Sequence, residues 1–99
     1  MKESDIILKF MRTLYQMDQN SLGDQFRLSE IAEKSGLKQY IYILKMTILP
    51  QLQSKELITM MEFGSDIPIV ITLEGRQEVK SYSPLRLSYL NVLEEIKRR

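Results

Sequence analysis

Histidine and cysteine, which carry most nucleophilic and metal-site chemistry in proteins, are both absent from this sequence of 99 residues. Without them there can be no zinc site of the usual kind, no histidine general base and no Ser-His or Cys-His nucleophile. Lysines and carboxylates remain, but the sequence has no clustered Asp/Glu pair and no glycine-rich phosphate loop. We therefore expect a protein that is not an enzyme and that uses neither a metal nor another cofactor.

The composition is that of one ordinary globular domain, with 43% hydrophobic and 27% charged residues. The formal net charge of +1 neither favours nor excludes nucleic acid. No apolar run approaches the roughly 20 residues that span a bilayer, and the N-terminal MKESDIILKF lacks the cleavage site of a signal peptide. Because the lack of cysteine also fits a reducing compartment, we expect a cytoplasmic protein.

The N-terminal segment predicts a helix from about residue 4 to 17, with Ser4 as its N-cap. A polar loop follows over residues 18–25. The apolar positions of the helix recur at helical spacing, which favours one buried face. They are Ile7, Phe10 or Met11, Leu14 and Met17.

The next segment predicts a compact helix followed by a sharp turn. After a short extended piece at 26–28, Ser29 is expected to cap a helix over 30–35. Gly36 is expected to end that helix in a left-handed conformation. A compact helix, a glycine turn and then a longer helix form the helix-turn-helix pattern.

The stretch QYIYILKMTIL (39–49) could be a strand or a helix. Its strand-like alternation covers only the first four residues, whereas a helical stripe extends over the whole segment, so we predict a helix. Pro50 should cause a kink or an early end near Leu49, because proline lacks the backbone donor that a helix needs. The stripe expected to face the core consists of Leu37, Ile41, Leu44, Ile48 and Leu52.

Two β-rich runs, 57–62 and 67–73, predict a hairpin with a four-residue loop at 63–66. Pro68 cannot donate to a neighbouring strand, so its strand should lie at an edge or begin there. Thr72 or Leu73 should then lead into a short helix, LEGRQEVK.

The C-terminal segment predicts one more helix, 84–98, with Ser83 and Pro84 at its start. We expect residues 1–82 and the helix within 83–99 to form a single α+β, mainly α domain. The apolar stripe of this last helix consists of Leu85, Tyr89, Val92 or Leu93, and Ile96.

Three pieces of the sequence, LSEIAEKSGL, LQSKELI and ITLEGRQEV, resemble the corresponding segments of winged helix-turn-helix regulators of the MarR and PadR type. The resemblance covers about residues 4–80, and the last helix is similar to the dimerisation helix that many such regulators carry. It implies a winged helix-turn-helix with a two-stranded wing and an added C-terminal helix. One departure concerns Glu56, which stands where a glycine often precedes the apolar pair that starts the wing.

The resemblance implies a DNA-binding transcriptional regulator whose helix at about 38–53 enters the major groove of double-stranded DNA. The wing turn, with Gly64 and Ser65, would lie along the phosphate backbone. A homodimer would form through helix 1 and the last helix, using Leu85, Tyr89, Val92, Leu93 and Ile96. The candidate DNA contacts are Ser29, Lys34, Lys38, Gln39, Tyr42 and Lys45.

Among these residues the lysines would neutralise phosphates and Gln39 could pair with an adenine edge. A second interpretation of Lys38 and Lys45 is that they form an ordinary solvated helix flank.

The expected outer face of the long helix favours a different partner. It presents Gln39, Tyr42, Ile43 and Met46, with Leu49 at its margin, and no arginine. Glu62 and Asp66 in the wing would repel phosphate. A mostly apolar outer face is typical of a protein-binding surface, so the alternative is a winged-helix module that binds a partner protein through Tyr42, Ile43 and Met46. Rotating the stripe by one position would bury Ile43 or Met46 and weaken this argument.

Overall fold

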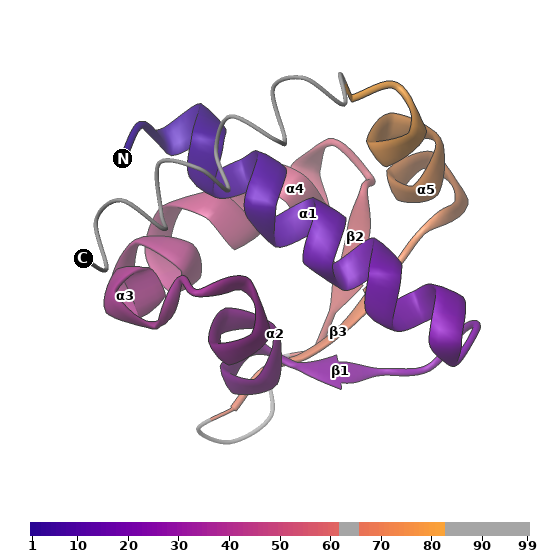
Figure 1. Cartoon of the computed structure of the whole chain (residues 1–99), viewed down its shortest axis with the longest axis horizontal. Coiled ribbons are helices and arrows are strands. Elements are labelled where there is room, and N and C mark those ends of the chain that lie inside the picture. Colours follow the sequence, from indigo (N-terminus) through magenta and orange to yellow (C-terminus); the bar gives the residue numbers. More distant parts are fainter. Residues whose placement is uncertain (62–65, 83–99) are drawn as a thin grey trace.

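The computed structural model describes residues 1–61 and 66–82 (Figure 1). It is mainly helical, with one small antiparallel sheet. In Figure 1 the long helix α1 crosses the front of the molecule, α2 and α3 lie to one side of it and α5 to the other, and the sheet lies behind. The elements are α1 Glu3–Asn20, β1 Phe26–Arg27, α2 Leu28–Ser35, η1 Lys38–Tyr40, α3 Ile41–Ile43, η2 Leu44–Ile48, α4 Leu49–Ser54, β2 Ile58–Met60, β3 Pro68–Ile71 and α5 Leu73–Lys80.

Helix α1 is longer than expected and turns a slightly different face to the core. It begins at Glu3 with Lys2 in the N-cap position and no side-chain cap, so the expected cap at Ser4 is wrong. Ile6 is buried where the sequence pattern predicted Ile7, which is only half-buried. The helix continues through Asn20 into the segment expected to be a loop.

Gly36 ends α2 as predicted. Its φ of 74° lies in the left-handed region, which glycine adopts without steric cost. The amide of Gly36 donates to the Glu33 carbonyl and the amide of Leu37 donates to the Ala32 carbonyl, at 3.2 and 2.8 Å. Both bonds satisfy carbonyls that the helix end would leave unpaired. The turn therefore directs Leu37, which is completely buried, into the core.

The elements η1, α3, η2 and α4 follow one another without a break and are called helix 38–54 below. An early end near Leu49 was wrong, because the helix widens into the π-helical turn η2 directly before Pro50 and continues to Ser54. In that turn the Leu49 amide donates to the Leu44 carbonyl, five residues back. An extra residue in one turn rotates everything after it by about 100° relative to an α-helix. Ile48 and Leu49 are consequently both fully buried.

The sheet has three strands in the order β1-β3-β2, all antiparallel. The predicted pairing of the two β-rich runs is confirmed. Strand β3 begins at Pro68, as expected, but it is the central strand and not an edge. Proline is tolerated there because it is the first residue of the strand and its carbonyl still accepts from the Met61 amide, at 3.3 Å.

One hydrophobic core joins all these elements. The predicted stripe of helix 38–54 lies on it, with Leu37, Leu44, Ile48 and Leu52 buried and Ile41 half-buried. Tyr82, at the end of the described segment, is packed against the core, and burial raises the pKa of its hydroxyl to about 12. Further core members are Phe10, Met11, Leu14, Leu28, Ile31, Ile58, Ile69 and Ile71.

Several expectations lie outside the described residues. They are the last helix over 84–98, its proposed dimerisation residues Leu85, Tyr89, Val92, Leu93 and Ile96, and the wing residues Gly64 and Ser65.

Candidate nucleic-acid interface

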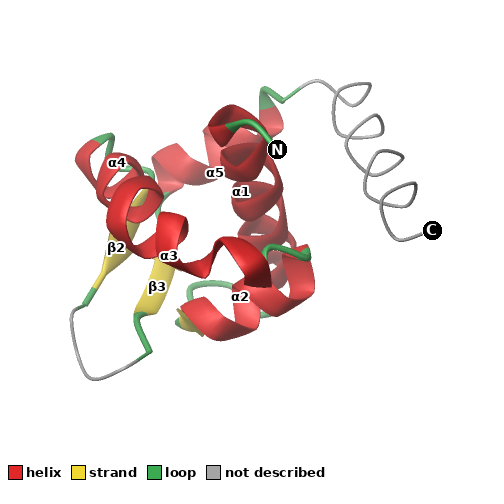
Figure 2. Cartoon of the chain, turned by 90° about the vertical axis from the view of Figure 1, so that its left-hand side faces the viewer, coloured by secondary structure: helices red, strands yellow, loops and turns green. Residues whose placement is uncertain are grey.

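The helix-turn-helix of α2 and helix 38–54 forms one side of the molecule, which faces the viewer in Figure 2, with the paired strands β2 and β3 next to it. Five of the six candidate DNA contacts are solvent-exposed on this unit. The structure places one on α2 and four on the first half of helix 38–54: Lys34, and Lys38, Gln39, Tyr42 and Lys45.

Ser29, the sixth candidate, is already engaged within the chain. Its hydroxyl donates to Asp66 Oδ2 at 2.6 Å and its amide donates to Asp66 Oδ1 at 3.1 Å. Helix α2 begins one residue earlier, at Leu28, so the expectation that Ser29 caps it is wrong. Asp66, from the segment before β3, instead supplies the acceptor for a free amide of the first turn of α2. This bond ties the base of the β2–β3 pair to the helix-turn-helix.

Asp66 also brings a negative charge into the candidate interface. The hydrogen bond from the Ser29 hydroxyl lowers the pKa of the Asp66 carboxyl, and the Ser29 amide and the positive charges of Arg27 and Lys45 lower it further. Asp66 is therefore ionised at neutral pH and partly offsets the field of these two cations. The exposed acids Glu30 and Glu33 of α2 add to the mixed charge of this side.

A strip of exposed apolar side chains runs along the outside of helix 38–54. Tyr42 is 72% exposed, Met46 62% and Ile43 39%, and these three residues are called the apolar strip below. Lys38 and Lys45, two helical turns apart, border one edge of this strip, and Gln39 lies on the same face. Leu49 does not belong to this face, contrary to expectation, because the π-helical turn rotates it into the core.

The junction between helix 38–54 and the sheet contains a strained residue. Glu56 has a φ of 62°. Among the described residues other than glycine, no other residue has a positive φ. This is the position at which the sequence departs from the glycine of winged-helix regulators. The left-handed conformation costs a side-chain-bearing residue about 1 kcal/mol or more.

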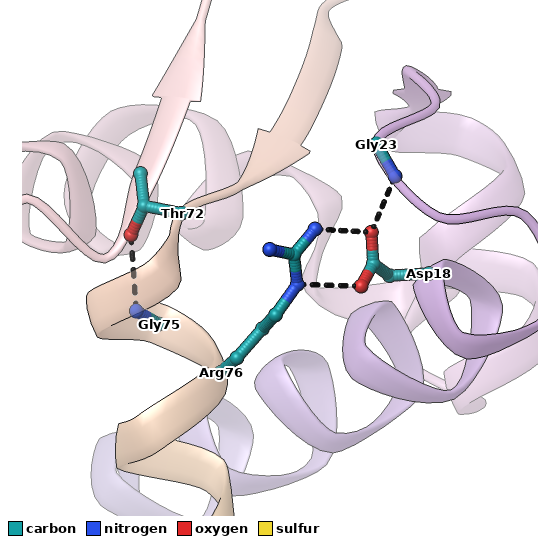
Figure 3. A network of polar contacts seen from close by, with 5 residues as sticks. All are labelled: Asp18, Gly23, Thr72, Gly75 and Arg76. Atoms are coloured by element: carbon teal, nitrogen blue, oxygen red, sulfur yellow. Dashed lines mark hydrogen bonds and ion pairs between the residues drawn. The ribbon is translucent and has the colours of Figure 1, made fainter.

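Thr72 fixes that junction from the other side and also contacts Gly75 at the start of α5 (Figure 3 shows the contact with Gly75). Its hydroxyl donates to the Glu56 carbonyl at 2.6 Å and accepts from the Gly75 amide at 3.0 Å, which caps α5. Gly75 packs so closely that an added Cβ would collide with the Leu57 carbonyl oxygen and lie 2.8 Å from Ile71 Cγ1. The strained turn, the sheet and α5 therefore form one tightly packed corner.

An ion pair holds α5 to the end of α1 (Figure 3). Arg76 Nε donates to Asp18 Oδ2 at 2.7 Å and a terminal guanidinium nitrogen of Arg76 donates to Oδ1 at 3.0 Å. The Gly23 amide also donates to Oδ1, at 3.0 Å. The hydrogen bonds from Arg76 are the main reason that the pKa of the fully buried Asp18 carboxyl is lowered. Sequence reasoning missed this pair because 58 residues separate its members.

Residues 1–61 and 66–82 contain no group of three or more acidic, histidine or cysteine side chains placed to hold a metal ion. Within the same ranges no helix combines the length and the apolar character needed to cross a bilayer.

The comparisons with known proteins identify no relative that would indicate a function for this surface. No protein-family model, no curated protein and no solved structure matches this chain significantly.

Proposed function

We propose that this chain is a winged-helix transcriptional regulator that binds double-stranded DNA with helix 38–54 in the major groove. The observation that carries the proposal is the exposure of Lys34, Lys38, Gln39, Tyr42 and Lys45 on the two helices of a helix-turn-helix. An α-helix fits the major groove of B-DNA, and lysines along one edge of it can neutralise phosphates while the neighbouring face meets base edges.

The order of the elements supports the same proposal. A helix, a short strand, two helices of a helix-turn-helix and a strand pair follow one another, and β1 pairs with β3. This is the arrangement expected of a winged helix, in which the β2–β3 pair is the wing. The bond between Asp66 and Ser29 would keep that wing at a constant position beside the recognition helix.

A DNA titration at two salt concentrations tests the proposal. Wild-type chain should bind mixed-sequence duplex DNA with steep salt dependence, because binding releases counterions from the phosphates. The Lys38→Ala/Lys45→Ala variant should bind more weakly and with a shallower salt slope. The matched control is Lys2→Ala/Lys80→Ala, which removes the same charge from exposed positions off the helix-turn-helix. No binding of wild type at low salt would reject the proposal.

We further propose a cytoplasmic homodimer, in which two recognition helices would enter successive major grooves about 34 Å apart. The apolar spacing of Leu85, Tyr89, Val92, Leu93 and Ile96 supports this. Sedimentation of a chain that ends before Ser83 should give a monomer where the whole chain gives a dimer. A dimer that survives the truncation would place the interface elsewhere.

A protein-binding module is the second candidate function. The observation in its favour is the apolar strip, because exposed apolar side chains grouped on one surface are typical of protein interfaces. In this alternative neither lysine pair would affect DNA binding, since DNA would not bind at all.

A further inference from the structure

The outer face of helix 38–54 has an unusual chemical composition for a surface that enters a groove of DNA. Between residues 38 and 54 the sequence contains no arginine, asparagine, aspartate or glutamate. The exposed side chains in its first half are two lysines, one glutamine, and the apolar strip. Lys38 and Lys45 lie two helical turns apart along one edge of the strip, and the positive charge of Lys45 contributes to lowering the pKa of the Asp66 carboxyl.

These residue types discriminate among bases in the major groove. Guanine is read most often by arginine or lysine, and cytosine can be read by a carboxylate that accepts from its amino group. Adenine is read by glutamine or asparagine, and the 5-methyl group of thymine is read by apolar contact. Gln39 with Tyr42, Ile43 and Met46 thus matches A·T pairs, and of the exposed residues in the first half of the helix only the two lysines have a side chain suited to guanine.

We propose that the DNA bound by this chain is A·T-rich, with Gln39 pairing to adenine and the apolar strip packing on thymine 5-methyl groups. This inference rests on the proposed function. Lys38 and Lys45 lie two helical turns apart along one edge of the strip, where they complement the phosphates of one DNA strand, which is why we assign the strip to DNA and not to a protein surface. The strip is then exposed in the free chain because its occupant is a base pair.

Replacing thymine by deoxyuridine tests the methyl contact directly, because it removes the 5-methyl group and leaves the hydrogen-bonding edge intact. Fluorescence anisotropy at one low salt concentration would compare an A·T-rich duplex, its uracil-substituted copy and a G·C-rich duplex of equal length. Wild type should prefer the A·T-rich duplex and lose about fourfold in affinity for each buried methyl group that is removed.

The Ile43→Ala/Met46→Ala variant should bind the thymine and uracil duplexes equally, with weakened affinity for the thymine duplex. Neither side chain belongs to the buried core, so the variant should fold as wild type does. The control variant Leu22→Ala/Leu73→Ala removes two exposed leucines from the α1–β1 loop and α5, and should keep the full difference between thymine and uracil.

Two failures can be told apart. If wild type binds duplex DNA but does not distinguish thymine from uracil, or if Ile43→Ala/Met46→Ala distinguishes them as well as wild type does, the A·T readout is overturned and DNA binding stands. If no duplex binds at low salt, the proposed function fails and the strip becomes a surface for a protein partner.

Discussion

The corner where α5 meets β2 and the end of α1 differs from the outer face of helix 38–54 in how its side chains are used. At the corner, the polar side-chain atoms of Asp18, Thr72 and Arg76 form hydrogen bonds with other groups of the chain. On the outer face, Tyr42 and Met46 expose most of their surface. Within the described residues no buried side-chain polar atom lacks a hydrogen-bond partner.

The side chains at the corner hold the fold together, whereas those on the outer face of helix 38–54 are available to contact a partner. The Asp18–Arg76 ion pair, in which the carboxylate is buried and the arginine is 26% exposed, holds α1 and α5 together, and its polar atoms are already bonded within the chain. An exposed apolar side chain contributes little to folding, so a group of them indicates a binding surface. Changes at the corner should therefore alter stability, and changes on the outer face should alter binding.

The largest effect on stability should come from Gly75→Ala. The new Cβ would collide with the Leu57 carbonyl oxygen, and backbone cannot move aside as a flexible side chain can. We expect a loss of about 3 kcal/mol in the free energy of unfolding, measured by urea denaturation. Gly23→Ala is the control, because it has open space around it and suffers only from its φ of 80°; it should cost about 1 kcal/mol. Equal losses in the two variants would contradict the close packing at Gly75.

Asp18→Asn should destabilise the chain by about 2 kcal/mol at neutral pH, because it removes a charged acceptor of the Arg76 hydrogen bonds. Since the folded-state pKa of Asp18 lies below the ordinary value of 3.8, its stabilising contribution is complete above that value and is lost as the pH falls through the folded-state pKa. The difference between wild type and variant should therefore be constant above about pH 5 and shrink below about pH 4. A difference that stays constant to lower pH would show that the ion pair is not responsible.

Glu56→Gly should stabilise the chain by about 0.5 to 1 kcal/mol. Glycine adopts a positive φ without strain, and this gain is larger than the loss from the greater conformational freedom of glycine in the unfolded chain. Thermal or urea unfolding would measure the gain. Glu56→Ala separates backbone from side chain, since it removes the carboxylate without relieving the strain. A gain of the same size in the alanine variant would assign the effect to the charge.

Asp66→Asn should have the smallest effect and should affect binding more than folding. It removes a negative charge beside Arg27 and Lys45, keeps one oxygen to accept from the Ser29 amide, and replaces the other oxygen by an amide nitrogen that can donate to the Ser29 hydroxyl. If this side binds DNA, its affinity should rise about threefold at low salt, since one repulsive charge next to the phosphates is gone. Asp24→Asn removes the same charge from the exposed α1–β1 loop and should change affinity less. Equal gains would mean that only net charge matters.

Much of the fold follows from signals that lie close together along the chain. Gly36 with Leu37, the apolar spacing from Leu44 to Leu52, and Thr72 before α5 each specify a local conformation through neighbouring residues. The exposure of Lys38, Gln39, Tyr42 and Lys45 was likewise predictable, because a helix with one apolar stripe turns its other residues to solvent.

Other features depend on which distant segments meet. Pro50 predicted a disturbance of the helix but not its form, since packing of both Ile48 and Leu49 in the core accompanies a π-helical turn that lets the helix continue. The pairing of β1 with β3 made the Pro68 strand central, although proline predicts an edge.

The hydrogen-bond partners of the polar side chains could not be predicted from neighbouring residues either, because they come from distant segments of the chain. Ser29 carries a sound capping signal, yet Asp66, 37 residues away, binds both its hydroxyl and its amide. Asp18 and Arg76 meet only because α1 and α5 pack together. Residue types and short spacings thus determine the helices and their exposed faces. Which partner satisfies a given polar group depends on contacts between segments far apart in the chain, and these form only when the core closes.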